Sequence, residues 1–311
     1  MSLSEILLRT DNRAFIAVAH LVPAYLARRL DGAFAREGID WNGHKSCPML
    51  SFDCDFPEDC LALPAVAEEL DRRDLKASFA CIGRWVEDYP EEHRTLVESS
   101  HEVFNHTYSH PELVNAPGRF VSFRSDLNER HWHELSLGEK REEIARCQRV
   151  VGDVLGFEMR GFRAPHFGKV DVDEIYDILA ELGLSYSSSA LASRSARLGL
   201  PVWRGDLLEI PVTTCPRHPW SSCDSWHAFY ARDGWHGRDF GELLERRVAD
   251  AVESNALTNI YLDPKDVGRF DFGRFLDRVA EEGECWRPTY TEFTAWYREA
   301  VGTTAMPAPS A

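Results

Sequence analysis

Residues 51–59 read SFDCDFPED and directly follow the apolar residues Met49 and Leu50. Two carboxylates, Asp53 and Asp55, stand two positions apart, and residues i and i+2 of a strand point to the same face. Two like charges at the edge of a core make each other harder to ionise. The stretch therefore predicts one of two things at the end of a buried strand: a bound cation between the carboxylates, or a solvated turn.

Short apolar runs alternate with amphipathic helical patterns from residue 47 onward. The runs expected to be strands are 48–53, 76–83, 101–107, 159–165, 184–189, 207–213 and 258–263. The helical patterns are 61–74, 91–100, 137–155, 172–183, 272–283 and 291–300. This alternation predicts parallel βαβ units, and over about 240 residues it favours a (β/α) barrel. In such a barrel the active site forms at the carboxyl ends of the strands, which is where Asp53 and Asp55 fall.

The chain is expected to have three parts: an N-terminal helical extension at 1–46, a barrel at 47–300 and a disordered tail at 301–311. Within the first part, residues 14–30 read AFIAVAHLVPAYLARRL. This run is interrupted by His20 and Pro23 and is too short to cross a bilayer. Two interpretations stay open: a helix on a membrane surface, flanked by Arg28 and Arg29, or a helix that packs on the barrel or on a second copy of the chain. Packing is favoured.

The composition is that of a globular protein, with 44% hydrophobic and 28% charged residues among 311. The net charge of −16 argues against a nucleic-acid partner, because phosphate binding needs clustered Lys and Arg. The eight cysteines form no CxxC pair, which favours a reducing compartment. With no recognisable export signal, a cytoplasmic location is expected, with peripheral membrane contact left open.

Two further motifs follow expected strands. The stretch NHTYSH contains His106 and His110, whose spacing puts both imidazoles on one face if the segment is a helical turn. Together with a carboxylate from another strand end they make a His₂-Asp set with an open fourth position, the pattern of a catalytic metal site. The stretch GFRAP places Arg163 after another strand. An arginine beside an aspartate lowers the pKa of that aspartate and holds its rotamer, although this motif by itself favours a surface arginine at a strand end.

These motifs, SFDCD, HTYSH and RAP in that order, resemble those of the polysaccharide deacetylase family (NodB-like, carbohydrate esterase family four) over roughly residues 47–290. The resemblance implies a distorted (β/α)7 barrel. It implies that Asp53 is the general base and that Arg163 orients it. It also implies that Asp55, His106 and His110 bind a divalent metal ion, with Zn²⁺ expected first and Co²⁺, Ni²⁺ or Fe²⁺ as alternatives.

The implied activity is hydrolysis of a carbon–nitrogen bond that removes an acetyl or formyl group from an amino sugar or glycan precursor. Two other functions stay open. The first is a barrel that binds a metal or glycan with little or no turnover. The second is hydrolysis of a linear or cyclic amide that is not a sugar.

The match to the family is incomplete at the last strand. Where the family carries a histidine as general acid, the segment IYLDP has Asp263. A buried aspartate with a raised pKa still donates a proton, and Glu209 is the neighbour expected to raise it. The other candidates for the acid are the histidines that follow or lie between late strands: His166, His218, His227 and His236.

The stretch 217–240 is rich in Trp, His and Tyr and has no clear periodicity. Aromatic rings that stack on sugar faces suit a substrate loop, while a loop folded over its own hydrophobic cluster is equally compatible. The residues expected to contact substrate are Pro165, His166, Trp220 and Trp226.

Overall fold

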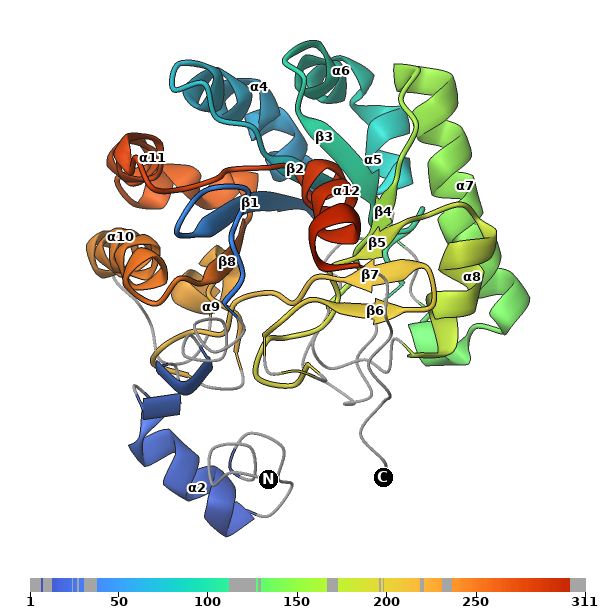
Figure 1. Ribbon diagram of the computed structural model, residues 1–311. Coiled ribbons are helices and arrows are strands. Elements are labelled where there is room, and N and C mark those ends of the chain that lie inside the picture. The colour runs from blue at the N-terminus through green and yellow to red at the C-terminus, as the bar shows by residue number, and fades with distance from the viewer. Residues whose placement is uncertain are drawn as a thin grey trace.

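The computed structural model describes residues 7, 13–23, 25–26, 28–30, 38–111, 127, 130–166, 173–195, 197, 199–218, 221–230 and 237–302. Its centre is an eight-stranded sheet in the order β6-β7-β5-β4-β3-β2-β1-β8 (Figure 1). The strands are β1 (Cys47–Cys54), β2 (Ser78–Cys81), β3 (Glu102–Asn105), β4 (Gly161–Phe162), β5 (Tyr186–Ser187), β6 (Val202–Arg204), β7 (Leu207–Glu209) and β8 (Leu257–Leu262).

All neighbouring strands in this sheet are parallel except β6 and β7. The sheet curls so that the segment after β7 reaches β8, where the Thr213 N–H donates to the Asn259 carbonyl at 2.9 Å. The curled sheet is therefore a distorted barrel, as expected. The seven expected strands are confirmed, and β6 was missed because it is a three-residue arm of a hairpin that turns at Gly205, where φ is +63°.

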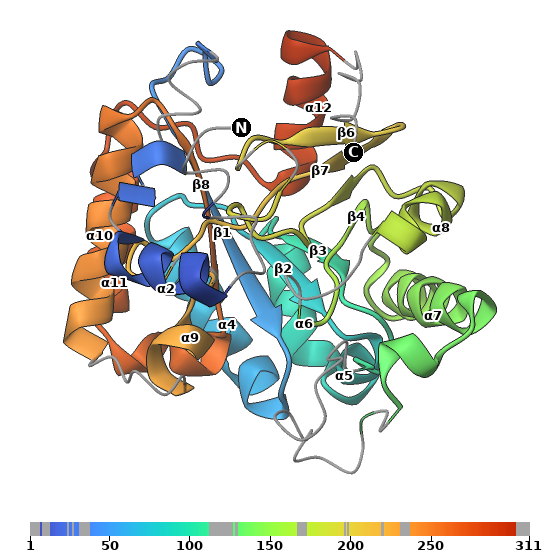
Figure 2. The same ribbon diagram turned by 90° about the horizontal axis from the view of Figure 1, so that it is seen from below.

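Helices surround the sheet in Figures 1 and 2. They are α4 (Pro57–Asp71), α5 (Gly83–Asp88), α6 (Pro90–Glu98), α7 (Leu137–Leu155), α8 (Tyr176–Glu181), α9 (Ser225–Tyr230), α10 (Gly237–Glu253), α11 (Phe272–Glu281) and α12 (Tyr290–Val301), with 3₁₀ turns η1 (Trp132–Glu134), η2 (Asp173–Ile175) and η3 (Pro264–Arg269). The expected limits of α7 are confirmed: Ser136 and Glu139 form a capping box, and Gly156 ends the helix at φ 66°. The sequence patterns missed α5, α9 and α10.

The helix α12 closes the amino-terminal end of the barrel. The Tyr290 N–H donates to Glu102 Oε2 at 2.9 Å, and Glu102 is the first residue of β3. The Glu102 carboxylate also accepts from the Tyr186 hydroxyl at 2.8 Å. With this end closed, the opposite end, where the strands reach their carboxyl termini, is the one that remains for a site.

The strand β1 lies in the centre of the core, and every residue in it is buried. Its Phe52 ring stacks on Phe79 of β2 with 4.8 Å between the centroids. The side chain of Cys54 packs in the same apolar cluster and is fully buried. Cys54 is therefore a packing residue, as expected, while Asp53 points to the other face of β1.

The helix α2 (Arg13–Leu21) lies apart from the sheet in Figure 1. Buried apolar side chains near it form a small cluster of their own, made of Leu7, Ala19, Leu26 and Leu30. Among the described residues, no helix is long and apolar enough to cross a membrane. The tail expected at 301–311 lies outside the described residues from position 303 on.

Candidate metal and catalytic site

The side chains of Asp55, His106 and His110 meet at the carboxyl ends of β1 and β3. Their donor atoms all lie within 4.8 Å of one another. Asp55 Oδ1 lies 3.1 Å from His106 Nε2 and 3.4 Å from His110 Nε2. Both histidines are almost fully buried, whereas 18% of the Asp55 side chain is exposed. The set is thus open to solvent through Asp55.

The tautomer of His106 is fixed by the backbone. Its Nδ1 lies 2.8 Å from the carbonyl oxygen of Arg163, which can only accept, so Nδ1 carries the proton of the neutral ring. In that tautomer Nε2 has a lone pair and faces another acceptor, Asp55 Oδ1. Among the described residues, Asp55 Oδ1 and His110 Nε2 are buried without a hydrogen-bond partner. Buried acceptors that face one another need a cation between them, so these residues fit a divalent metal ion.

The segment from Asn105 to His110 converges on the site by a route other than the helical turn considered from the spacing. The segment is a bent loop, in which Thr107 and His110 have positive φ values of 66° and 51°. The Asn105 side chain accepts from the Thr107 N–H at 2.9 Å, and the Thr107 hydroxyl accepts from the His110 N–H at 3.0 Å. These two side chain to backbone contacts hold the left-handed residues in place and aim both imidazoles at Asp55.

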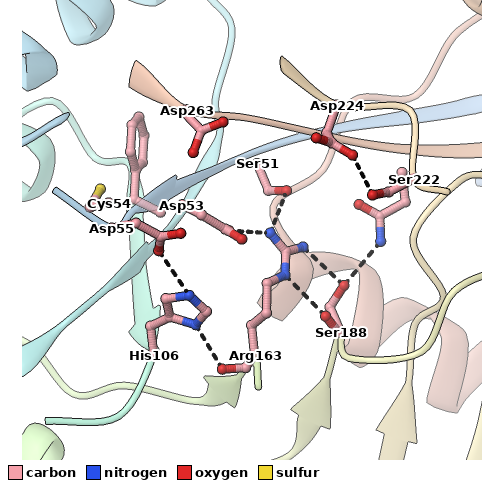
Figure 3. Close-up of polar contacts among 12 residues, drawn as sticks. Ser51, Asp53, Cys54, Asp55, His106, Arg163, Ser188, Ser222, Asp224 and Asp263 are labelled. Carbon is pink, nitrogen blue, oxygen red and sulfur yellow. Dashed lines mark hydrogen bonds and ion pairs between the residues drawn. The ribbon is translucent and has the colours of Figure 1, made fainter. Parts of the chain in front are cut away.

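The guanidinium of Arg163 is fully buried and contacts Asp53, with 2.5 Å between Nη1 and Oδ1 (Figure 3). All five of its N–H donors have acceptors. The other acceptors are Ser51 Oγ at 3.1 Å, the Ser188 carbonyl and hydroxyl at 3.0 Å each, and the Tyr290 hydroxyl at 2.7 Å. A guanidinium held at every donor fixes the rotamer of Asp53, which is the geometric part of the role expected for Arg163.

The two aspartates of β1 have opposite pKa shifts. Burial raises the pKa of Asp53 above its usual value, although the charge of Arg163 opposes this shift. Burial acts the same way on Asp55, but protonated His110 and His106 imidazoles would hold the pKa of that carboxyl well below its usual range. Environments that push two neighbouring carboxyls apart in pKa are typical of acid–base sites.

Asp263 follows β8 and is 1% exposed. Figure 3 shows its carboxyl group next to the strand β1, in the same close-up as Asp53 and Asp55. The Ser225 hydroxyl donates to Asp263 Oδ2 at 2.6 Å, and Lys265 Nζ lies 3.3 Å from Oδ1. Burial raises the pKa of Asp263 to about 7, with Asp55 adding to the rise and Lys265 opposing it.

The expected neighbour of Asp263, Glu209, has other partners, so this expectation was wrong. Glu209 accepts from the Ser189 and Ala190 N–H groups at 2.7 and 2.8 Å and from the Tyr176 hydroxyl at 2.9 Å. It thus caps the chain after β5. The segment 207–213 runs on past β7 to Thr213, which bonds to Asn259 of β8, and this path was not visible in the sequence.

Lys265 is the functional candidate that the sequence reasoning missed. Its ammonium lies 3.4 Å from Asp59 Oδ1 and sits over the Phe56 ring, 4.5 Å from the centroid. The fully buried Asp59 in turn accepts from the Phe56 N–H at 2.9 Å. A lysine two positions after an aspartate at a strand end was the available signal.

The residues expected to contact substrate fall into three groups. Pro165 is buried after β4, and the His166 ring lies 5.2 Å from the His110 ring, edge to face. Trp226 stacks on Phe56, the residue after Asp55, with 6.0 Å between centroids and 8° between planes. Trp220 and the acid candidate His236 lie outside the described residues.

The two remaining acid candidates, His218 and His227, face each other. Their Nδ1 and Nε2 atoms are 2.7 Å apart, and both belong to a cluster that shares no residue with the Asp55 set. The structure therefore leaves Asp263 and His166 as the described candidates beside the Asp55 set.

Comparisons with known proteins agree with this geometry. Residues 42–187, which include Asp53, both histidines and Arg163, match the family model described as polysaccharide deacetylase. The peptidoglycan-N-acetylglucosamine deacetylase of Bacillus cereus is 26% identical over 123 residues, or 40% of this chain and 37% of that protein. The chitooligosaccharide deacetylase of Azorhizobium caulinodans is 33% identical over 81 residues, or 26% of this chain and 38% of that protein.

The chain spans less than two-fifths of the length of the curated relatives it matches. Among solved structures, a proposed polysaccharide deacetylase from Mycobacterium smegmatis superposes with a TM-score of 0.68 at 18% identity, covering 88% of this chain and 96% of that one. At this identity the superposition supports the fold alone.

Proposed function

Because residues 42–187 match the polysaccharide deacetylase family model, we propose that the chain is a member of that family and a metal-dependent hydrolase that removes an N-acyl group, acetyl first, from an amino sugar. The proposal rests on two groups of residues that lie at the carboxyl end of β1. Asp55, His106 and His110 form one set, and Asp53 on the Arg163 guanidinium forms the other.

The metal chemistry is assigned to the first set. A divalent ion on Asp55, His106 and His110, zinc being the expected one, would polarise the acyl carbonyl and acidify a water ligand. Two imidazoles and one carboxylate are a donor set that suits zinc, and three protein ligands leave a coordination position for the reaction.

The proton transfers are assigned to Asp53 and Asp263. Asp53 takes the proton of the attacking water, and Arg163 keeps the carboxylate oriented for that step. Asp263 gives a proton to the departing amine, because a pKa of about 7 leaves a substantial fraction of this carboxyl protonated near neutral pH. Ser225 holds the Asp263 carboxyl in one orientation through its hydroxyl.

The substrate is proposed to be a sugar because of the aromatic side chains Phe56 and Trp226. Phe56 directly follows Asp55 in the chain and its ring stacks on Trp226, and aromatic faces are surfaces on which sugar rings stack. The curated relatives are named for deacetylation of peptidoglycan N-acetylglucosamine and of chitooligosaccharides, which supports an N-acetylated sugar here.

Two substitutions separate the base from the metal ligands. Asp53→Asn and His106→Ala are each expected to lower kcat by about 10²–10⁴-fold, since each removes an element of the proton-transfer or metal chemistry. Only His106→Ala is expected to lose the metal ion of the Asp55 set. Acetate or formate release from N-acyl sugars measures the first effect, and elemental analysis of the purified protein measures the second.

Asp153→Asn and His133→Ala are matched controls, because both residues are exposed and lie outside the site. Full activity of Asp53→Asn would refute the role of that residue as base. Normal metal binding without acyl release from N-acetyl or N-formyl sugars, free or lipid-linked, would instead favour a barrel without turnover. Release only from small non-sugar amides would refute the substrate class.

A further inference from the structure

A second group of side chains of the types that bind metal ions lies within residues 215–227. It consists of Cys215, His218 and His227, whose donor atoms lie within 4.8 Å of one another. Cys215 Sγ lies 3.7 Å from His218 Nδ1, and His227 Nε2 lies 2.7 Å from the same nitrogen. Cys215 is 2% exposed, while the two histidines are partly exposed. Neither the family motifs nor the proposed reaction uses these three residues.

The backbone brings Cys215 and His218 together in a tight turn. The Cys215 N–H donates to the Ser221 carbonyl at 2.7 Å, and the Ser221 N–H donates to the His218 carbonyl at 3.0 Å. His227 comes from the first turn of α9, where its N–H donates to Asp224 Oδ1 at 2.6 Å. Two separately anchored segments therefore present their donors to one point.

The distances are close to those of a tetrahedral zinc site. Zn–S and Zn–N bonds of about 2.3 and 2.0–2.1 Å place tetrahedral S and N ligands about 3.6 Å apart and two N ligands about 3.3 Å apart. The cysteine–histidine distance of 3.7 Å matches the first value. The histidine–histidine distance of 2.7 Å needs to open by about 0.6 Å, which ring rotation of a partly exposed histidine supplies.

We propose that Cys215, His218 and His227 bind a second zinc ion, which fastens the turn at 215–218 to α9. Binding removes the proton of the Cys215 thiol to solvent and forms one Zn–S bond and two Zn–N bonds. Three protein ligands leave the fourth position to water.

The second ion would stabilise α9, a helix that contacts residues of the proposed active site. The helix begins with Ser225, whose hydroxyl holds Asp263, and continues with Trp226, whose ring stacks on Phe56. The helix has only six residues, which is too short to be stable by itself. An ion bound by His227 and the preceding turn would hold α9 in place. It would thereby stabilise the Ser225–Asp263 hydrogen bond and the Trp226–Phe56 stack.

Cobalt(II) and zinc binding to the wild-type protein tests the inference without any substitution. After chelation and dialysis, the protein is expected to bind two equivalents of zinc. With cobalt it is expected to show a near-ultraviolet thiolate-to-metal band and the strong visible bands of tetrahedral Co²⁺, because one ligand is a cysteine. One equivalent or fewer without a thiolate band in the wild type overturns the proposal.

Variants locate the ion. Cys215→Ser is expected to lose the thiolate band and one of the two equivalents. The control Cys223→Ser, which changes another buried cysteine of the same segment outside the cluster, retains both. A thiolate band that survives in Cys215→Ser overturns the assignment. Should that variant not fold, the partly exposed His218→Asn takes its place and is expected to lose one equivalent.

His106→Ala separates this inference from the proposed function. That variant is expected to keep one equivalent and the whole thiolate band, because Cys215 is not among the ligands of the first site. A wild type that binds one equivalent with a thiolate band would refute metal binding at Asp55 and leave the second site standing.

Discussion

At the scale of single residues, Asp263 shows how surroundings set the chemistry of a side chain. An exposed aspartate is ionised near neutral pH and has no proton to give. Asp263 is buried beside Asp55 and Asp266, and these surroundings raise its pKa to about 7 against the opposing charge of Lys265. A residue type that looks unsuitable in the sequence therefore acquires the pKa of a general acid from its position.

The pH dependence of activity tests this role. Asp263 donates only when protonated, so kcat is expected to fall as pH rises through about 7. Asp263→Asn is expected to lower kcat and to remove this basic limb, while the acid limb stays. The pH profiles of kcat for the two proteins measure the effect, and a basic limb that is unchanged in Asp263→Asn would transfer the role to another group, with His166 next.

The same shift has a consequence for stability. The folded-state pKa of Asp263 is above its unfolded value, so its contribution to stability is fully present below about pH 4 and is lost as pH rises through about 7. The substitution Asp263→Asn, which leaves no ionisable group at this position, is accordingly expected to stabilise the fold more at pH 8 than at pH 5, relative to the wild type. Urea unfolding of both proteins at the two pH values measures the difference, and a pH-independent effect would contradict the raised pKa.

At the scale of elements, the short strands β4 and β5 pack closely because residue 161 is a glycine. A Cβ built on Gly161 of β4 would lie 1.8 Å from the Tyr186 ring of β5. The tyrosine cannot retreat easily, because its hydroxyl donates to Glu102 in the buried network under α12. The close approach of β4 and β5, and with it the position of Arg163, depends on the missing side chain.

Two glycine substitutions are expected to act in opposite directions. Gly161→Ala forces Tyr186 out of place and is expected to lower the free energy of unfolding by about 1–3 kcal/mol. Gly152→Ala, in α7 with nothing within 4 Å of the added Cβ, is expected to raise it by about 0.5–1 kcal/mol through helix propensity. Urea unfolding of both variants measures the difference, and equal effects would contradict the packing argument.

At the scale of the whole molecule, the site joins parts of the chain that are far apart in sequence. Asp53 on β1, the histidines after β3, Arg163 after β4 and Asp263 after β8 meet at one end of the barrel. Metal binding to such a set couples to folding, because the unfolded chain does not hold these donors together.

Zinc is therefore expected to stabilise the fold through the Asp55 set. At a free zinc concentration 100 times the Kd, one site raises the free energy of unfolding by about 2.7 kcal/mol. His106→Ala is expected to lose the increment of this set and to keep only that of the Cys215, His218 and His227 set, whereas His133→Ala keeps both. Urea unfolding with zinc and with chelator gives the increment for each protein. The same increment in wild type and His106→Ala would contradict binding at this set.

The sequence by itself was enough to predict the barrel, its seven expected strands and the meeting of Asp53, Asp55, His106 and His110 at strand ends, while the pairing of Arg163 with Asp53 came from the family resemblance. The reason is that strand and helix periodicity are local, and parallel strands necessarily bring their carboxyl ends to one edge. The hairpin arm β6 and the short helix α9 carry too few residues for a periodic signal.

Only the tertiary structure decided what surrounds each charge. Glu209 was expected beside Asp263 and instead caps the chain after β5, while Lys265 and Ser225 are the groups that contact Asp263. The same holds for the convergence of Cys215, His218 and His227. Burial and charge contacts depend on loop paths between strands, and those paths are set by packing across the whole barrel, which no local pattern records.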